Sequence, residues 1–208
     1  MKKKIYLVDN RPKFLSVLET IVQVTVIAAL GLFAARFMFH STATSSRSME
    51  PTIVPESVVF TDRCIYRLTE PKRFDVITFR RETGSSTGET DIPARTVGNG
   101  EQDILIRRVV GLPGETIRIE KGTVFINEVP LDVSAYISEI TSDGIAKDSI
   151  RLSENEYFVL GDTPANSEDS RSYTVGVVLK RQILGRAWLA AKSITEIHMI
   201  DQIYWSRE

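Results

Sequence analysis

Residues 20–35 read TIVQVTVIAALGLFAA, sixteen consecutive residues without a charged side chain. Apolar residues continue on both sides of this run. A helix over residues 14–39 would be 26 residues long, which is enough to cross a bilayer core of about 30 Å with some tilt. Glu19 and Arg36 fall in its outer turns, where their side chains can reach the headgroups. The sequence therefore predicts a single N-terminal transmembrane helix over residues 14–39.

The charges around the apolar run predict its orientation. Five basic residues precede it, namely Lys2, Lys3, Lys4, Arg11 and Lys13. By the positive-inside rule, residues 1–13 stay in the cytoplasm and residues 40–208 lie on the outer side of the cell membrane. The alternative is a cleaved signal peptide, because small residues follow the run at positions 41–43. Either interpretation exports the rest of the chain.

Composition narrows the possible functions of the exported part. The formal net charge of −1 argues against a nucleic-acid partner, which would need a basic face. Cys64 is the only cysteine and His40 and His198 are the only histidines, so we expect no disulfide and no metal site. The chain has neither a GxGxxG fingerprint after a strand nor a phosphate-binding P-loop, and we expect no cofactor.

Beyond residue 41, short apolar runs rich in β-branched residues alternate with turn residues, as is typical of strands. The predicted strands cover residues 57–61, 75–79, 104–110, 116–119, 123–126, 156–160 and 175–179. The stretch TIRI-EKG-TVFI predicts a hairpin with Gly122 in its turn. Residues 82–102 and, less clearly, 138–149 have loop composition. The predicted fold is mostly β: a transmembrane helix, then an antiparallel β catalytic domain with a smaller β-rich insertion at residues 116–155.

One stretch just beyond the apolar run carries candidate chemistry. Residues 46–52 read Ser-Arg-Ser-Met-Glu-Pro-Thr, and serines at i and i+2 of an extended segment point the same way. One hydroxyl could attack a carbonyl while the other donates to the oxyanion. A serine nucleophile needs a group that activates it. His40 lies at the predicted membrane edge and His198 in an apparent terminal strand, so lysine is the known alternative to histidine for this role. On its own, an SxS stretch is more often a polar linker.

Three further segments give the serines a context: RFDVITF at 73–79, IRRVVGLPGE at 106–115 and GDTPANSEDSR at 161–171. Their order after an N-terminal anchor resembles the type I signal peptidases, membrane-anchored serine endopeptidases that use a Ser/Lys dyad. The resemblance covers the chain from the anchor to residues 185–187.

The resemblance implies a role for each matching residue. Ser48 matches the nucleophile, and Ser46 matches the serine whose hydroxyl stabilises the oxyanion together with the Ser48 amide. Ser167 matches the serine that orients the base, while Asp169 and Arg171 match a charge pair that holds the same loop. Met49 and Pro51 match positions that shape the site.

The sequence departs from the family pattern at the base. Arg107 occupies the position of the catalytic lysine, directly before Arg108 and the GLPG turn. A guanidinium stays protonated in proteins, so it cannot accept the Ser48 proton as a neutral lysine can. Thr163-Pro164 also replaces the usual Asn-Arg pair, which we expect to reshape the loop that carries Ser167.

Two functions therefore compete. The first is a signal peptidase that removes signal peptides from exported preproteins, with small apolar residues at the first and third positions before the cut. The peptide would bind in extended form, pairing with residues 104–107. The second is an impaired homologue, anchored in the lipid bilayer, that binds signal peptides or assists a second, active signal peptidase. Retention of Ser46, Ser48 and the SEDSR motif favours the first function, and Arg107 favours the second.

Overall fold

The computed structural model describes residues 13–81, 104–193 and 195–200 of the chain. The chain divides into two compact units, Met1–Met38 and Phe39–Glu208. The predicted loop at residues 82–102 lies outside the described residues.

The first unit contains one helix, α1 (Lys13–Met38). Its stretch Phe14–Leu32 has a mean hydropathy of 1.9 and no buried side chains, so by length and composition it can span a membrane. The hydroxyls of Thr20 and Thr25 donate to the carbonyls of Ser16 and Ile21, one turn back, at 2.9 and 2.8 Å. These bonds satisfy polar groups that would otherwise face hydrocarbon. The prediction of an N-terminal apolar helix is confirmed.

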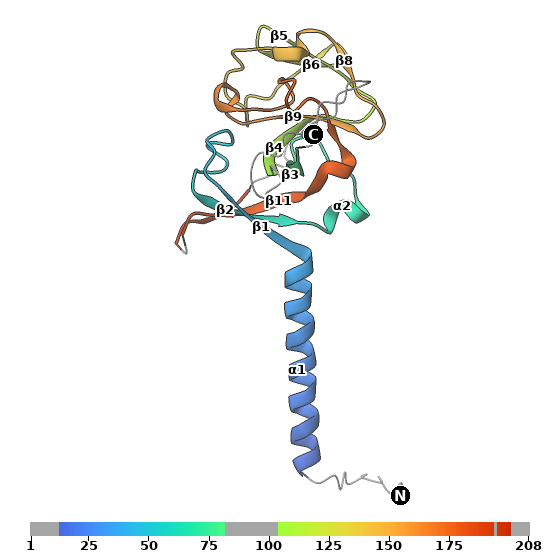
Figure 1. Cartoon of the computed structure of the whole chain (residues 1–208), viewed down its shortest axis with the longest axis vertical. Coiled ribbons are helices and arrows are strands. Elements are labelled where there is room, and N and C mark those ends of the chain that lie inside the picture. Colours follow the sequence, from blue (N-terminus) through green and yellow to red (C-terminus); the bar gives the residue numbers. More distant parts are fainter. Residues whose placement is uncertain (1–12, 82–103, 194, 201–208) are drawn as a thin grey trace, which may run out of the picture. The chain divides into compact units, whose positions relative to one another are not determined.

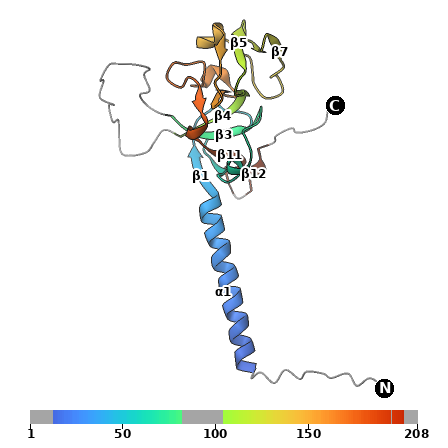
Figure 2. The same cartoon turned by 90° about the vertical axis from the view of Figure 1, so that its right-hand side faces the viewer.

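The second unit is built on a large antiparallel sheet with the strand order β1-β2-β11-β3-β4-β9-β10, and β12 pairs with β11. Its strands are β1 (Phe39–Thr44), β2 (Ser57–Asp62), β3 (Val76–Arg80), β4 (Ile104–Gly111), β9 (Glu156–Leu160), β10 (Val178–Leu179), β11 (Ile183–Ala191) and β12 (Ile197–Met199). In two perpendicular views β3 and β4 lie between β1 and the smaller sheet (Figures 1 and 2).

The smaller sheet has the order β7-β6-β5-β8 and is also antiparallel. Its strands are β5 (Thr116–Glu120), β6 (Thr123–Ile126), β7 (Val129–Leu131) and β8 (Ile150–Arg151). The predicted hairpin is present, with Ile119 opposite Val124. Lys121 and Gly122 form its turn with φ of 49° and 78°, the left-handed pair of a two-residue hairpin turn. The predicted fold class, an apolar helix followed by a large and a small antiparallel β-sheet, is confirmed.

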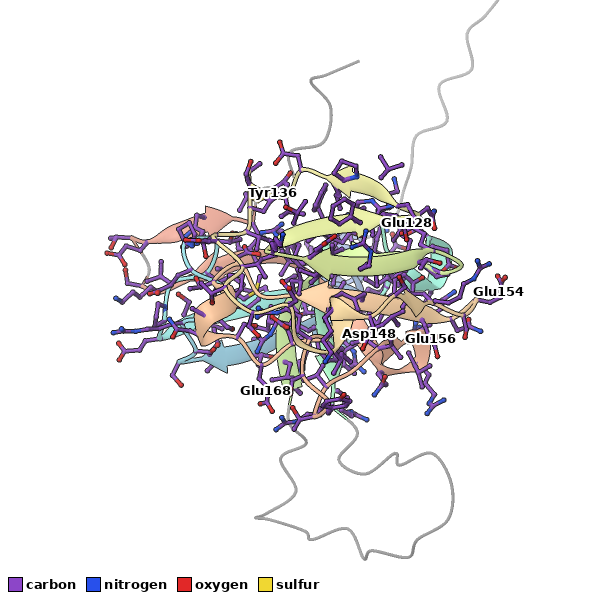
Figure 3. All side chains as sticks on the ribbon, turned by 90° about the horizontal axis from the view of Figure 1, so that it is seen from above. Glu128, Tyr136, Asp148, Glu154, Glu156 and Glu168 are labelled. Atoms are coloured by element: carbon purple, nitrogen blue, oxygen red, sulfur yellow. The ribbon has the colours of Figure 1, made fainter. Side chains whose placement is uncertain are left out.

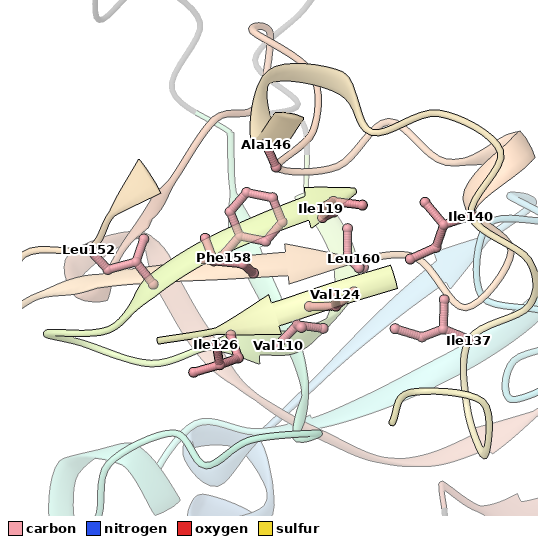
Figure 4. Close-up of a cluster of buried hydrophobic side chains, with 11 residues drawn as sticks. Val110, Ile119, Val124, Ile126, Ile137, Ile140, Ala146, Leu152, Phe158 and Leu160 are labelled. Atoms are coloured by element: carbon pink, nitrogen blue, oxygen red, sulfur yellow. The ribbon is translucent and has the colours of Figure 1, made fainter. Parts of the chain in front are cut away.

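An apolar cluster joins the two sheets. Ile119 and Val124 from the small sheet pack with Phe158 and Leu160 of β9, and all four are fully buried (Figure 4). The short elements are α2 (Ile65–Leu68) and the 3₁₀ turns η1 (Gly144–Lys147), η2 (Pro164–Asn166) and η3 (Lys180–Gln182). The insertion thus shares its core with the main sheet.

Several strands differ from the sequence prediction, which did not include β7 and β8 of the small sheet. β11 is the longest strand of the chain and lies between β2 and β3, although its sequence ILGRAWLAA has few β-branched residues. A side chain at Gly185 would stand 2.1 Å from the Asp62 carbonyl oxygen, so β11 approaches β2 as only glycine allows. β1 begins at Phe39, where the helix was expected to end. β10 covers only two of the five predicted residues.

A fully buried ion pair links β4 to the chain beyond β9. The guanidinium of Arg108 donates to both carboxylate oxygens of Asp162 at 2.8 and 2.6 Å, and neither side chain is exposed. Arg108 also donates to the Phe74 carbonyl and to Oγ1 of Thr52, both at 3.0 Å. Its guanidinium carbon lies 4.3 Å from the centre of the Tyr136 ring. Every contact ties β4 to a segment distant in the sequence.

We expect Asp162→Asn to destabilise the β unit by about 3–5 kcal/mol, because it removes one charge of a buried pair and leaves Arg108 uncompensated. Urea unfolding of the detergent-solubilised protein, followed by the fluorescence of Trp188 in β11, measures the change.

Glu128→Gln is the matched control, since it makes the same carboxylate-to-amide change in an exposed ion pair. Glu128 pairs with Arg118 at 3.0 Å and has 66% of its side chain exposed. In Figure 3 it lies well apart from Glu168, a residue of the loop that follows β9. We expect it to change stability by less than about 0.5 kcal/mol. Equal losses in the two variants would contradict the assigned role of the buried pair.

Candidate active site

Two serine hydroxyls meet at the turn that follows β1. The Ser46 hydroxyl donates to Oγ of Ser48 at 2.9 Å, and the Ser48 amide donates to Oγ of Ser46 at 3.2 Å. Ser48 is only 1% exposed, whereas Ser46 is exposed. The two side chains converge as the i, i+2 spacing predicted, but Ser48 lies in a turn and not in an extended strand.

The loop after β9 holds the serine turn in place. The Thr163 amide donates to the Ser48 carbonyl at 2.9 Å, and the Thr163 hydroxyl donates to the Glu50 carbonyl at 2.8 Å. Thr163 belongs to the Thr163-Pro164 pair, one of the places where the chain departs from the pattern of the family it resembles. In the sequence only that departure marks Thr163, and its positioning role follows from these two hydrogen bonds.

Arg107 reaches the same serine from β4. Its Nη1 donates to Oγ of Ser48 at 2.9 Å and to the Ile106 carbonyl at 2.6 Å. Its Nε and Nη2 both donate to the Glu168 carbonyl, at 2.9 and 2.7 Å. The side chain is 4% exposed. The guanidinium is therefore fixed with one N–H directed at the candidate nucleophile, and Glu168, which sequence analysis did not single out, supplies the carbonyl that holds it.

The carboxylates nearest to Arg107 are bound to other arginines. Glu168 pairs with Arg81 at 2.8 Å, and Asp169 pairs with Arg171 at 2.9 Å. Burial lowers the pKa of Arg107, while the negative charges of Asp169 and Glu168 oppose that shift. A guanidinium nevertheless remains protonated at neutral pH. Arg107 can donate hydrogen bonds and offer positive charge, but it cannot accept a proton from Ser48.

The remaining predicted residues, Ser167, Asp169 and Arg171, lie in the loop after β9, which contacts Arg107 through the Glu168 carbonyl. Asp169 accepts from the Gly161 amide at 3.1 Å and from Nε of Arg171 at 2.9 Å. Arg171 also donates to the Pro164 carbonyl at 2.7 Å, so the pair braces this loop. Oγ of Ser167 is buried without a hydrogen-bond partner among the described residues. Its role in orienting the base stays a prediction.

A small cavity of about 70 Å³ opens at Ser48. Its lining consists of Thr42, Ala43, Thr44, Ser46, Ser48, Met49, Ile53, Ile104, Leu105, Ile106 and Arg107. Two of its walls are strand edges. β1 is the terminal strand of the large sheet as described, and in β4 the residues from Ile104 to Arg107 pair with β3 while β9 pairs only from Arg108 onward.

The described lining of the cavity contains no alternative general base, since none of these residues is lysine, histidine or a carboxylate. His198 approaches the Thr52 carbonyl at 3.3 Å instead. Within the described ranges, no group of three His, Cys, Asp or Glu residues could hold a metal ion. The arrangement offers a nucleophile and two hydrogen-bond donors for an oxyanion, with a fixed cation in place of a base.

Comparison with known proteins gives this geometry its context. Residues 17–191 match the family model described as "Signal peptidase, peptidase S26". The "Probable signal peptidase I-2" of Synechocystis is 30% identical over 165 residues, which cover 79% of this chain and 67% of that protein. The "Signal peptidase I S" of Bacillus subtilis is 27% identical over 185 residues, covering 85% of this chain and 90% of that protein.

A crystal structure of a signal peptidase I from Enterococcus faecalis V583 matches 57% of this chain and 97% of that one, with 29% identity and a TM-score of 0.40. The family model spans most of the chain, from within the N-terminal helix through β11. The chain therefore belongs to the signal peptidase family, peptidase S26.

Proposed function

We propose that this chain cleaves signal peptides from exported preproteins, with Ser48 as the nucleophile and with turnover limited by Arg107. The observation that supports it is the position of the Ser48 hydroxyl, in hydrogen-bond contact with Ser46 and Arg107 beside a cavity between two strand edges. In this proposal residues 1–13 stay in the cytoplasm, α1 crosses the bilayer, and the β unit works on the outer side.

The substrate would bind as an added strand. The edges of β1 and β4 offer backbone donors and acceptors to an extended peptide, and alternate side chains of such a peptide point the same way. A cavity of about 70 Å³ accepts a small side chain and excludes a large one. This fits the expectation of small apolar residues at the first and third positions before the cut.

The reaction would follow acyl-transfer chemistry. Oγ of Ser48 attacks the scissile carbonyl, the amine of the mature protein leaves, and water hydrolyses the resulting ester. The Ser46 hydroxyl and the Ser48 amide, which bond to each other in the structure, would turn to the oxyanion. The proton of Ser48 has to pass to solvent, because Arg107 cannot take it, and the departing amine takes its proton from solvent.

A second candidate is signal-peptide binding without turnover. The bond from Nη1 of Arg107 to Oγ of Ser48 favours it, because a donor directed at the nucleophile lowers its electron density where a base would raise it. In that case the protein would retain signal peptides or assist an active signal peptidase.

Arg107→Lys distinguishes the two candidates. General-base assistance contributes about 10²–10⁴-fold to a rate, so we expect the variant to cleave a preprotein faster than the unmodified protein by that factor. Cleavage is measured with detergent-solubilised full-length protein and separated by gel electrophoresis.

The control is the double variant with Ser48→Ala, which must lose the gained activity. Slow, Ser48-dependent cleavage by the unmodified protein supports the first candidate, and peptide binding without cleavage supports the second. If Arg107→Lys gains nothing although the protein folds, the assignment of Arg107 as the limiting residue is wrong.

Ser46→Ala tests the oxyanion donor. In the Arg107→Lys background we expect a loss of about 10²–10³-fold in kcat, since one donor to the tetrahedral intermediate disappears. Ser134→Ala, which changes an exposed serine in the insertion, is the matched control and should leave kcat unchanged. A loss confined to KM would contradict a role in the transition state.

A further inference from the structure

Within the described part of the chain, the side chain of Arg107 is a buried cation without a carboxylate partner. Its four hydrogen bonds go to two backbone carbonyls and to a neutral hydroxyl. Among the described residues, no Asp or Glu oxygen lies within the 4.0 Å that defines an ion pair with it. Its neighbour Arg108, equally buried, has both oxygens of Asp162.

Buried charges in proteins are normally paired, because an isolated ion loses its hydration without compensation. The nearby carboxylates of Glu168 and Asp169 cannot supply the missing charge by direct contact, since Arg81 and Arg171 hold them. Arg107 lines the cavity at Ser48, where its Nη1 donates to a neutral hydroxyl. No described residue supplies the missing anion at this cavity, and a negatively charged ligand bound there would supply it.

The groups around this space suit a carboxylate. The guanidinium of arginine matches the geometry of a carboxylate, and the hydroxyls of Ser46 and Ser48 can donate to its oxygens. The cavity has a volume of about 70 Å³, and one water molecule occupies about 30 Å³ in the liquid. The cavity therefore has room for about two waters, or for the two oxygens of a carboxylate.

The edges of β1 and β4 indicate what kind of molecule would bring a carboxylate to the site. The cavity is lined by residues of β1 and β4, so an extended peptide between these edges would present its backbone to Ser48. A continuous peptide has a neutral amide at that point. A peptide that ends there has a negatively charged α-carboxylate, and capture of chain termini is a known mode of peptide recognition.

We propose that the site at Arg107 binds the C-terminal carboxylate of an already cleaved signal peptide and prefers this product to an uncleaved chain. This inference rests on the proposed function, since it takes the signal peptide as the ligand. Arg107 donates to the carboxylate from one side and the serine hydroxyls from the other. The protein then acts as a receptor for released signal peptides, whatever its rate of cleavage.

The test compares two probes on the full-length protein in detergent micelles. Both are the same fluorescent signal-peptide fragment, ending in Ala-X-Ala at the cleavage position. One ends in a free carboxylate and the other in a carboxamide, so neither contains a bond to cleave. We expect the acid to bind about 10- to 100-fold more tightly than the amide, as measured by fluorescence anisotropy.

Two variants assign the preference to Arg107. Arg107→Gln should bind acid and amide equally, and its affinity for the amide reports whether the peptide cleft is intact. Arg118→Gln, the same change in an arginine of the small sheet that pairs with exposed glutamates, should keep the preference for the acid.

Each outcome decides between the proposals. Equal binding of acid and amide by the unmodified protein overturns the carboxylate site and leaves the proposed function standing. A preference that survives in Arg107→Gln also overturns it. Binding of neither probe overturns both the carboxylate site and the proposed peptide cleft.

Discussion

The buried ion pair between Arg108 and Asp162 is the constraint on which the candidate site depends. Arg108 follows Arg107 in β4, and Asp162 precedes Thr163, whose amide and hydroxyl hold the turn of Ser48. The Thr52 hydroxyl, just after that turn, contacts both Arg108 and Asp162. One charge pair thus fixes three segments distant in the sequence. Because both side chains are excluded from water, their separation would leave uncompensated charge in the core, and the relative position of nucleophile and cation is held accordingly.

Two adjacent arginines of one strand serve different purposes because side chains of a strand alternate between its faces. Arg108 turns to a carboxylate and a tyrosine ring and becomes part of the core. Arg107 turns to the cavity, where backbone carbonyls satisfy its N–H groups but leave its charge without a direct counterion among the described residues. The same residue type joins the core at one position and contacts the Ser48 hydroxyl at the next, and only the fold distinguishes them.

Local pattern predicted much of this architecture. The alternation in TIRIEKGTVFI and the glycine in its turn specified the hairpin of β5 and β6, because turn chemistry and strand register act within a few residues. β11 was not among the predicted strands, since its alanines and leucines favour helix and only the close approach of Gly185 to β2 explains its place. Ser46, Ser48 and Arg107 came from motifs. Thr163 holds the turn of Ser48 through its backbone amide and its hydroxyl, and Glu168 holds Arg107 through its backbone carbonyl. Contacts of this kind leave almost no trace in a sequence.

A permanent cation changes what this scaffold can favour. A neutral lysine takes the proton of the serine during the attack and returns it later, so it acts on the transition state. A guanidinium offers the same charge at every stage. At the proposed site it would stabilise the developing oxyanion, and it would equally stabilise the carboxylate that remains when the peptide is released. Binding energy shared by transition state and product raises the affinity for the product without a matching gain in turnover. With Arg107 fixed by the Glu168 carbonyl, the proposed site would favour retention of the product over turnover.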